Sequence, residues 1–339
     1  MKLIKFQELD KKRWNDNLSS MSGNLHYATW QIIEYFSEFE KVENLSFSLF
    51  EGKKCLAMIP LGVTKSEDGK NTLSFGNSYC TSPVVNKNLS NYEARKLQTN
   101  IRLFVEETGK KNCANFYKLR SHPVYFEQNK PLISSANQFY QLKWAEEFFV
   151  HNTIIIDLNY SLDSIWNDFS KYHKKNIKKI SNKNLKFNVL NKKSKKTLID
   201  EQFKKFKNAH FRSAKRMTRS NSSWSKMKDM ILNGESILFY MTHKNVEISY
   251  LYCGTYKKFS WGWTQVNLDE FEKEFMPRHI LEWLTIKYFK KQKYKFYEIG
   301  ERYFSYKNFK PTEKEESISE FKEKFGGKVY PRVYFSSKL

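Results

Sequence analysis

The stretch Ile318–Gly327 reads Ile-Ser-Glu-Phe-Lys-Glu-Lys-Phe-Gly-Gly, the pattern of an amphipathic helix that ends at two glycines. Its first residue, Phe321 and Phe325 lie three and four positions apart, so a helix places them on one apolar face. Lys322 is expected at the edge of that face. The two glycines predict the end of the helix, because glycine adopts the left-handed cap conformation at little cost.

A lysine at the edge of an apolar face needs a partner, because burying an unpaired ammonium is costly. Lys322 can reach water along its aliphatic chain or pair with an internal carboxylate. Alternatively, it faces a polar cavity that holds an anion. Its position alone leaves these alternatives open.

The chain of 339 residues is too long for one typical core and suits two domains. It is 40% hydrophobic and 17% aromatic, so we expect a large core and no extensive disorder. The aromatic and irregular segment 121–150 is typical of a connector, and the apolar strand Thr153–Leu158 follows it. The sequence therefore predicts domains at 1–150 and 151–339.

The formal net charge is +23, from 59 basic and 36 acidic residues. Such an excess predicts a polyanionic partner, which can be RNA, DNA, an anionic membrane surface or a phosphorylated substrate. Lysine dominates the basic residues, which also fits an AT-rich genome. The charge alone does not separate these interpretations.

The cysteines are isolated in the sequence and form no CxxC motif, so we expect buried thiols in a reducing compartment and no metal site. They are Cys55, Cys80, Cys113 and Cys253. No window approaches 18 apolar residues, and the start Met1–Lys5 is not a signal peptide. We expect a cytoplasmic, monomeric protein that can contact the inner face of the membrane peripherally.

The order of expected elements indicates an α+β fold with mixed, mostly antiparallel sheets flanked by helices. After Thr153–Leu158, the second half predicts a helix over Leu162–Ile180, a strand, two helices and a three-stranded meander. A helix after Pro277 and a strand over Tyr294–Ile299 follow. The first half has a shorter version of this order, with a long helix from Asn91 that ends at Gly109. A structural duplication is therefore expected.

A lysine-rich segment follows the start of the second half. Phe169–Ile199 contains eleven lysines and no acidic residue. In the expected helix, the basic side lies opposite an apolar stripe that includes His173, and we expect that histidine in the core. The basic side carries Lys171, Lys174, Lys175, Lys178 and Lys179. This surface is either simply solvated or follows the phosphates of a nucleic acid.

Two further segments are candidates for substrate contact. Trp263 belongs to Trp-Gly-Trp on an expected strand, where core packing and lining of a cleft are both consistent with the sequence. Arg302, Tyr303 and Lys307 follow the carboxyl end of an expected strand, where ligand sites of α/β proteins usually lie. Alternating aromatic and basic residues suit stacking and phosphate contact.

Several chemistries lack their motifs in this sequence. HExxH, GxSxG and GxxxxGK[ST] are absent, which argues against zinc hydrolysis, serine catalysis and P-loop ATP use. The histidines are scattered along the chain.

The run Phe-Lys-x-x-Phe-Gly-Gly at 321–327 resembles the closing signature of the FemA/FemB/FemX aminoacyltransferases, a family of doubled GNAT-fold proteins. The segments Trp166–Phe169, Trp224–Gly234, Trp261–Trp263 and Trp283–Gly300 follow in the order typical of that family. The resemblance covers roughly residues 155–330 well and the first 120 weakly.

The resemblance implies two GNAT-like domains that share a cleft, and transfer of an aminoacyl or acyl group to an amine of a cell-envelope precursor, as in peptidoglycan biogenesis. It places Lys322 at the reacting ester, as the catalytic residue. No tightly bound cofactor is implied; the co-substrate is aminoacyl-tRNA or acyl-CoA. Aminoacyl-tRNA is favoured by the net charge, and acyl-CoA by the absence of the coiled-coil arm found in some tRNA-using members.

Two alternatives remain. One is an acyl-CoA N-acyltransferase that acts on a nucleotide-linked amino sugar or a surface-polysaccharide precursor. Against it, Phe275–Ile280 lacks the glycines with which ordinary GNAT enzymes hold the CoA pyrophosphate. The other is a non-enzymatic basic protein that binds RNA or a membrane.

Overall fold

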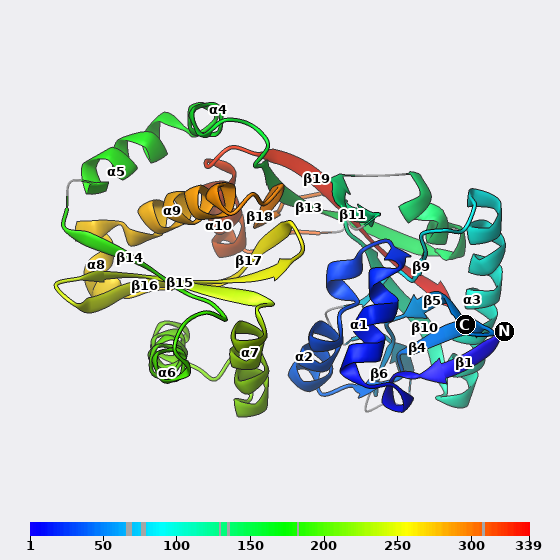
Figure 1. Cartoon of the computed structure of the whole chain (residues 1–339). Coiled ribbons are helices and arrows are strands. Elements are labelled where there is room, and N and C mark those ends of the chain that lie inside the picture. Colours follow the sequence, from blue (N-terminus) through cyan, green and yellow to red (C-terminus); the bar gives the residue numbers. More distant parts are fainter. Residues whose placement is uncertain (66–69, 76–78, 129, 134–135, 182, 307–308) are drawn as a thin grey trace. The chain divides into compact units, whose positions relative to one another are not determined.

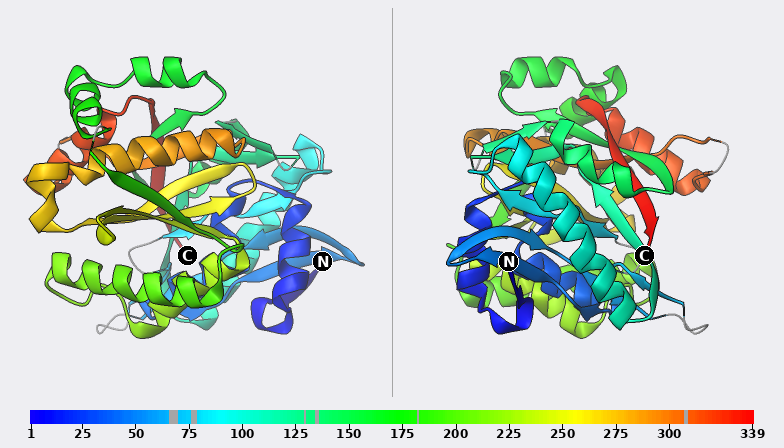
Figure 2. Two further views of the ribbon diagram at one scale, coloured as in Figure 1. Left: turned by 60° about the vertical axis from the view of Figure 1, so that its left-hand side comes forward. Right: turned by 90° about the vertical axis from the view of Figure 1, so that its right-hand side faces the viewer.

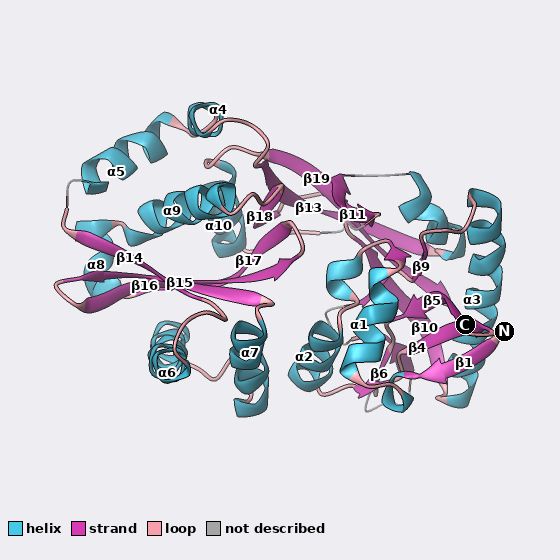
Figure 3. Cartoon of the chain, viewed as in Figure 1, coloured by secondary structure: helices cyan, strands magenta, loops and turns pink. Residues whose placement is uncertain are grey.

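The chain folds as two compact units, each with helices and sheet (Figures 1 and 3). The computed structural model describes residues 1–65, 70–75, 79–128, 130–133, 136–181, 183–306 and 309–339. Unit 1 comprises Met1–His151 and Pro331–Leu339, and unit 2 comprises Asn152–Tyr330. The expected α+β class is confirmed.

The C-terminal segment belongs to unit 1, whereas the sequence predicted a second domain that extends to Leu339. The last strand, β19 (Lys328–Lys338), runs antiparallel to β10 (Ala114–Ser121), with Phe116 opposite Lys338. The alternation of apolar and polar residues within a strand identifies its buried face but not its partner strand. The pairing of β19 with β10 was therefore not predictable from the sequence.

Unit 1 is built from short strands and a few helices. Its helices are α1 (Lys11–Ser19), α2 (Trp30–Glu40) and α3 (Asn91–Lys111), with 3₁₀ turns η1 (Phe6–Glu8), η2 (Leu25–Tyr27) and η4 (Ala136–Trp144). Its strands besides β10 are β1 (Lys2–Lys5), β2 (Met21–Ser22), β3 (Glu43–Asn44), β4 (Phe47–Glu51), β5 (Lys54–Ile59), β6 (Gly62–Thr64), β7 (Asn71–Leu73), β8 (Cys80–Thr81), β9 (Val84–Asn86), β11 (Val124–Glu127) and β12 (Lys130–Ile133). One sheet has the order β1-β4-β5-β9-β2, and in a second β19, β10, β7, β6 and β3 are neighbours.

Helix α3 is longer than the sequence predicted. It continues through Gly109, which lies inside the helix and is buried. A Cβ at this position would lie 2.5 Å from Cδ1 of Leu339. The glycine therefore makes room for the end of the chain and does not stop the helix.

Unit 2 repeats the plan of a meander, a helix and a parallel strand. Its strands are β13 (Glu147–Asp157, which begins in unit 1), β14 (Leu185–Leu190), β15 (Ser236–His243), β16 (Val246–Tyr256), β17 (Phe259–Asn267) and β18 (Phe296–Arg302). Its helices are α4 (Leu162–Asn167), α5 (Lys171–Ser181), α6 (Lys196–Ala214), α7 (Asn221–Asn233), α8 (Asp269–Phe275), α9 (Pro277–Lys291) and α10 (Glu313–Glu323). The strand order is β14-β15-β16-β17-β18-β13. Helix α9 contacts β15–β17 on one face, and α6 and α7 cover the other (Figure 2).

The helix expected over Leu162–Ile180 is two helices, α4 and α5. The chain turns at Asp168–Ser170, where the Ser170 N–H donates to the carbonyl of Lys324. A Cβ at Gly326 would lie 2.7 Å from Cβ of Asp168. The closing glycines therefore let the chain after α10 pack against this break.

Helix α10 begins at a capping box, in which Thr312 Oγ1 accepts from the Glu315 N–H and the Glu315 carboxylate accepts from the Thr312 N–H. The glycines after it have φ angles of 72° and 86°, as the sequence predicted. Phe325 is fully buried, but Ile318 is 39% exposed and does not share its face. The helix packs on β18 through the side that carries Ser319 and Lys322. Ile318 lies on another side of the helix and is therefore left exposed.

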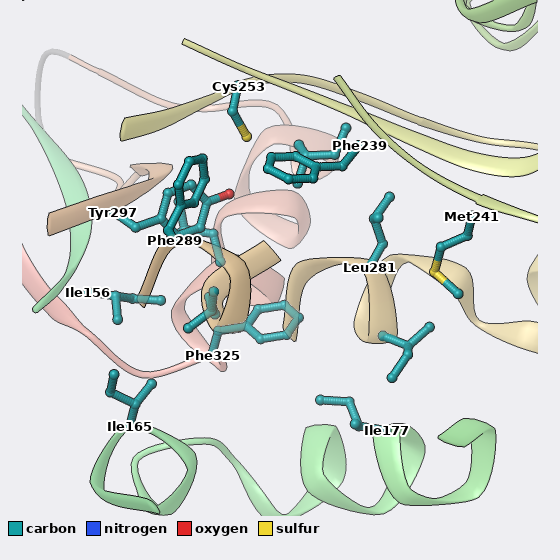
Figure 4. Packing of buried hydrophobic residues seen from close by; sticks show 14 of the residues in the cluster. Ile156, Ile165, Ile177, Phe239, Met241, Cys253, Leu281, Phe289, Tyr297 and Phe325 are labelled. Carbon is teal, nitrogen blue, oxygen red and sulfur yellow. The ribbon is translucent and has the colours of Figure 1, made fainter. Parts of the chain in front are cut away.

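One apolar cluster fills the space between the sheet of unit 2 and α4, α5, α9 and α10. Figure 4 shows side chains of the cluster pointing toward one another, among them Phe239, Leu281 and Phe325. The cluster explains the amphipathic pattern of α5, whose apolar residues Ile177 and Ile180 are buried. Cys253 lies in this cluster as a free thiol.

The remaining cysteines are free thiols as well. Cys55 and Cys80 are buried, as expected, but Cys113 is exposed, which corrects the expectation for that residue. Of the helices in the described ranges, none is long and apolar enough to cross a membrane.

Candidate active site

The strands β17 and β18 separate at the centre of the unit 2 sheet. Among the described residues they pair in parallel only over Phe259–Trp261 and Phe296–Glu298. Just beyond, each strand carries an extra residue against its other neighbour: Trp263 in β17 and Ile299 in β18. Such bulges bend strands and are frequent next to active sites. The point of separation is therefore the candidate site.

The side chain of Lys322 reaches this point. Figure 1 shows α10 beside β18, and a Cβ at Gly300 would overlap Lys322 Nζ. Gly300 also has a φ of 139°, which side-chain-bearing residues rarely adopt. The φ angle favours glycine at position 300, and the lysine occupies the space that a side chain there would take.

A buried carboxyl group on α9 lies close enough to Lys322 for the ammonium to act on its pKa. Glu282 is 4% exposed, and its Oε1 accepts a hydrogen bond of 2.5 Å from the Tyr297 hydroxyl. Burial raises the pKa of Glu282 to about 7, and the Tyr297 hydrogen bond and the charge of Lys322 oppose that rise. A group that titrates near neutral pH therefore accompanies the lysine.

The sequence analysis missed Glu282. The signal that could have identified it is a single acidic residue within the apolar run Ile280–Ile286 of α9. A helix that is apolar on most sides is buried, so a carboxylate within it needs a partner.

Arg302 and Tyr303 have partners within unit 2. Arg302 is 8% exposed, its Nε donates to Glu323 Oε2 at 2.6 Å, and its Nη1 contacts Ser319 Oγ at 3.3 Å. The Tyr303 hydroxyl donates to the Glu301 carboxylate. The Arg302 contacts tie β18 to α10. The substrate-binding role predicted for Arg302 and Tyr303 stays a prediction. Lys307 lies outside the described residues.

The structure places Trp263 on the opposite face of the sheet from Lys322. Its ring lies 5.8 Å from that of Tyr252, whose hydroxyl donates to the Met227 carbonyl of α7. Lys322 acts on Glu282 of α9, on the other face. The half-buried Trp263 ring and the lysine thus flank the separated strands from two sides.

The five lysines predicted to bind polyanions lie on α5. Lys171, Lys175, Lys178 and Lys179 are exposed, and Lys174 is half-buried with its ammonium donating to the Asn167 carbonyl at 2.8 Å. Within the described ranges, none of the five pairs with a carboxylate. The structure separates this basic surface from the apolar side of the helix, and its role as a binding surface stays a prediction.

Aromatic rings cover the first turn of α9. The ring centroid of His279 lies 4.6 Å from that of His173 and 4.9 Å from that of Phe321. His173 is fully buried and its Nε2 donates to the Phe321 carbonyl at 3.0 Å, as expected for a core histidine. Burial lowers the pKa of both histidines to about 4.

These lowered pKa values predict a loss of stability in acid. Between about pH 6.5, the ordinary histidine pKa, and about pH 4, the unfolded chain binds protons that the folded chain excludes, so the free energy of unfolding falls as the pH falls. Urea unfolding at pH 7 and pH 5 should show a smaller fall for His173→Gln than for the wild type. Equal falls in the two proteins would contradict the assignment.

In the described part of the chain, no three or more His, Cys, Asp and Glu side chains are grouped so that they could hold a metal ion.

Comparison with solved structures identifies the fold. FemX matches over 100% of this chain and 98% of its own, with a TM-score of 0.67 and 11% identity. L-PGS from Bacillus licheniformis matches over 97% and 91%, with a TM-score of 0.60 and 11% identity. A tandem GNAT protein from the clavulanic acid biosynthesis pathway matches over 99% and 98%, with a TM-score of 0.54 and 8% identity. No protein-family model matches the sequence, and no curated protein sequence is detectably similar.

This chain therefore has the doubled GNAT fold of FemX. The predicted resemblance in fold is confirmed. At such low identity the likeness is one of fold, and the reaction is argued from the residues of the site.

Proposed function

We propose that this protein transfers an aminoacyl or acyl group from an activated ester or thioester to an amine, at the site where β17 and β18 separate. The observation that carries the proposal is the inward course of Lys322, whose Nζ lies against Gly300 in the vicinity of the buried Glu282. A lysine ammonium held beside separated strands can stabilise negative charge on a carbonyl oxygen. The doubled GNAT fold shared with FemX supports the same reaction class.

The chemistry requires little beyond orientation and one cation. The amine nitrogen attacks the carbonyl carbon, the carbonyl oxygen becomes an oxyanion, and the bond from carbon to the leaving oxygen or sulfur then breaks. The proton lost by the amine ends on that leaving atom, which gives an amide and an alcohol or thiol. Orientation can contribute about 7–11 kcal/mol, and the Lys322 ammonium about 3 kcal/mol by stabilising the oxyanion.

Aminoacyl-tRNA is the donor that the residues favour. An ordinary GNAT enzyme holds the CoA pyrophosphate at the turn before the helix that corresponds to α9. Here His173 and Phe321 pack on the ring of His279 at that turn, and the His279 N–H donates to the Met276 carbonyl. The net charge of +23 and the exposed lysines of α5 suit a polyanion.

The acceptor we propose is an amine of a cell-envelope precursor, on a peptide or a sugar. The test uses bulk tRNA charged with labelled amino acids, with a nucleotide-linked peptide precursor and a nucleotide-linked amino sugar as acceptors. Label should move to an acceptor from tRNA and not from acyl-CoA. Transfer from acyl-CoA alone would select the other donor, and no transfer from either would overturn the proposal.

The lysines of α5 give a prediction that separates tRNA binding from general charge. Replacing Lys171, Lys175, Lys178 and Lys179 by glutamine should weaken tRNA binding. It should also reduce the slope of log K against log salt by about 0.7–0.9 for each phosphate that the variant no longer neutralises. Filter binding across a salt series measures this slope.

The matched control for this prediction removes the same charge from unit 1. It replaces four exposed lysines there, Lys2, Lys12, Lys53 and Lys96, by glutamine. If both variants lose affinity equally, the net charge and not the α5 surface attracts the tRNA. Binding without any transfer would favour the alternative of a non-enzymatic RNA-binding protein.

A further inference from the structure

The first turn of α5 carries an exposed aromatic ring within its basic surface. Tyr172 is 58% exposed. Lys175 and Lys179, both exposed, follow it at three and seven positions, so the three side chains lie along one side of the helix. Helix α5 lies on the outer side of α9, away from the sheet of unit 2 (Figures 1 and 4). The Tyr172 ring is therefore presented to solvent beside cationic side chains.

Buried rings support the Tyr172 ring from beneath. Its centroid lies 5.9 Å from that of His173 and 5.8 Å from that of His279, at interplanar angles of 51° and 65°. Both histidines are buried and uncharged at neutral pH, because burial lowers the pKa of each to about 4. These contacts restrict the motion of the tyrosine ring while more than half of the residue stays accessible. The ring is thus a prepared surface for another flat group.

The same histidine rings connect Tyr172 to the helix that carries the lysine of the site. His173 Nε2 donates to the Phe321 carbonyl at 3.0 Å, and the Phe321 ring centroid lies 4.8 Å from that of His173 and 4.9 Å from that of His279. Lys322 is the next residue after Phe321, on the side of α10 that packs on β18. One layer of histidine rings therefore separates Tyr172 from the segment that carries Lys322.

A flat ring beside lysines suits unpaired nucleotides. Proteins bind single-stranded nucleic acid with aromatic rings that stack on the bases and with cations that neutralise the phosphates. In a duplex the bases already stack on one another, so an exposed protein ring finds no free base face. An anionic membrane would also attract the lysines, but a helix that lies on a membrane inserts an apolar face. The apolar side of α5, with Ile177 and Ile180, is already buried in the core.

We propose that Tyr172 stacks on a base of the unpaired 3′ end of the donor tRNA, while Lys175 and Lys179 neutralise the adjacent phosphates. The inference rests on the proposed function, in which aminoacyl-tRNA is the donor. The ester of an aminoacyl-tRNA is on the ribose of its last nucleotide. A contact with the unpaired nucleotides next to that ribose holds the part of the tRNA that must reach Lys322.

The experiment measures binding of the whole protein to deacylated bulk tRNA and to the same tRNA without its unpaired 3′ nucleotides. Tyr172→Leu should weaken binding of intact tRNA about 10-fold to 100-fold, the cost of losing one base stack. The salt slope should stay unchanged, because no phosphate contact is lost. Tyr172→Trp should retain the wild-type affinity. The shortened tRNA should bind equally to the wild type and to Tyr172→Leu, because the base that stacks is absent.

Tyr160→Leu is the matched control. Tyr160 is 52% exposed in the same unit but precedes α4 and lies outside the basic surface of α5. This variant should bind both RNAs as the wild type does. Wild-type affinity of Tyr172→Leu for intact tRNA, or an equal loss on both RNAs, would overturn the inference. A loss of binding to phosphatidylglycerol vesicles with unchanged tRNA binding would overturn it as well, and would assign the ring to a membrane surface.

Because the RNA is deacylated, this result is read without the transfer reaction. Transfer from charged tRNA together with wild-type binding by Tyr172→Leu would refute the stacking role alone. Binding that depends on Tyr172 in a protein that transfers nothing would support the stacking role and refute the proposed function.

Discussion

Replacing Lys322 by methionine should lower the rate of aminoacyl transfer by about 10²–10³-fold, the cost typical of removing one group that stabilises an oxyanion. Methionine keeps most of the aliphatic chain and removes the ammonium that lies against Gly300. Because the amine and the ester still bind, the loss should appear in kcat more than in KM. The transfer assay with charged tRNA measures both.

The same substitution removes a positive charge from the vicinity of Glu282. The pKa of Glu282 is already raised to about 7, so the carboxyl group can take up a proton when the ammonium is removed. We therefore expect Lys322→Met to fold. The double variant Lys322→Met with Glu282→Gln, which carries no charge at either position, should be as inactive as the single variant.

Lys324→Met is the matched control, since Lys324 is exposed and lies two residues away at the end of α10. It should retain wild-type transfer. If Lys322→Met transfers at the wild-type rate while its unfolding curve shows a folded protein, the ammonium has no catalytic role. The lysine would then be only the counter-ion of Glu282.

Replacing Phe325 by alanine should lower the free energy of unfolding of unit 2 by about 3–5 kcal/mol, as large-to-small changes of buried phenylalanines do. The ring is fully buried, and its centroid lies 5.3 Å from those of Phe169 and Phe321 and 4.4 Å from that of His173. These rings come from α4–α5 and α10, so the cavity would open where several elements meet. Urea unfolding midpoints report the change.

Ile318→Ala provides the comparison on the same helix. Ile318 is 39% exposed, so its truncation should cost less than about 1 kcal/mol. The sequence pattern alone would assign both residues the same importance. If both variants lost the same free energy of unfolding, Ile318 would be as buried as Phe325, which would contradict the packing of α10 described above.

Local patterns determined much of this protein. The apolar stripe of α5, the proline at the start of α9 and the glycines after α10 each depend on neighbours within a few residues, and the structure has them as expected. The order of meander, helix and strand also follows from local periodicity, and it was enough to indicate the doubled fold.

The site was predictable only in part. Helical spacing placed Lys322 at the edge of the face of Ile318, whereas the structure exposes Ile318 and turns Ser319 and Lys322 toward β18. Pairing with an internal carboxylate was one of the alternatives that the sequence left open. The neighbour of Lys322, Glu282, lies 40 positions earlier on another helix, and nothing local connects the two. Gly300 was predicted to end the strand Tyr294–Ile299, but it lies inside β18, at the position that accommodates the lysine.

Tertiary packing decided the remainder. It divided the expected helix Leu162–Ile180 at the place where the Gly326 backbone packs against Asp168, and it exposed Ile318 because β18 covers another side of α10. It also returned β19 to unit 1, beside β10. The physical reason is common to all three: the residue order determines which side chains prefer burial and which dihedral angles are accessible, whereas the partner that supplies the burial lies far away along the chain and is selected only when the elements pack.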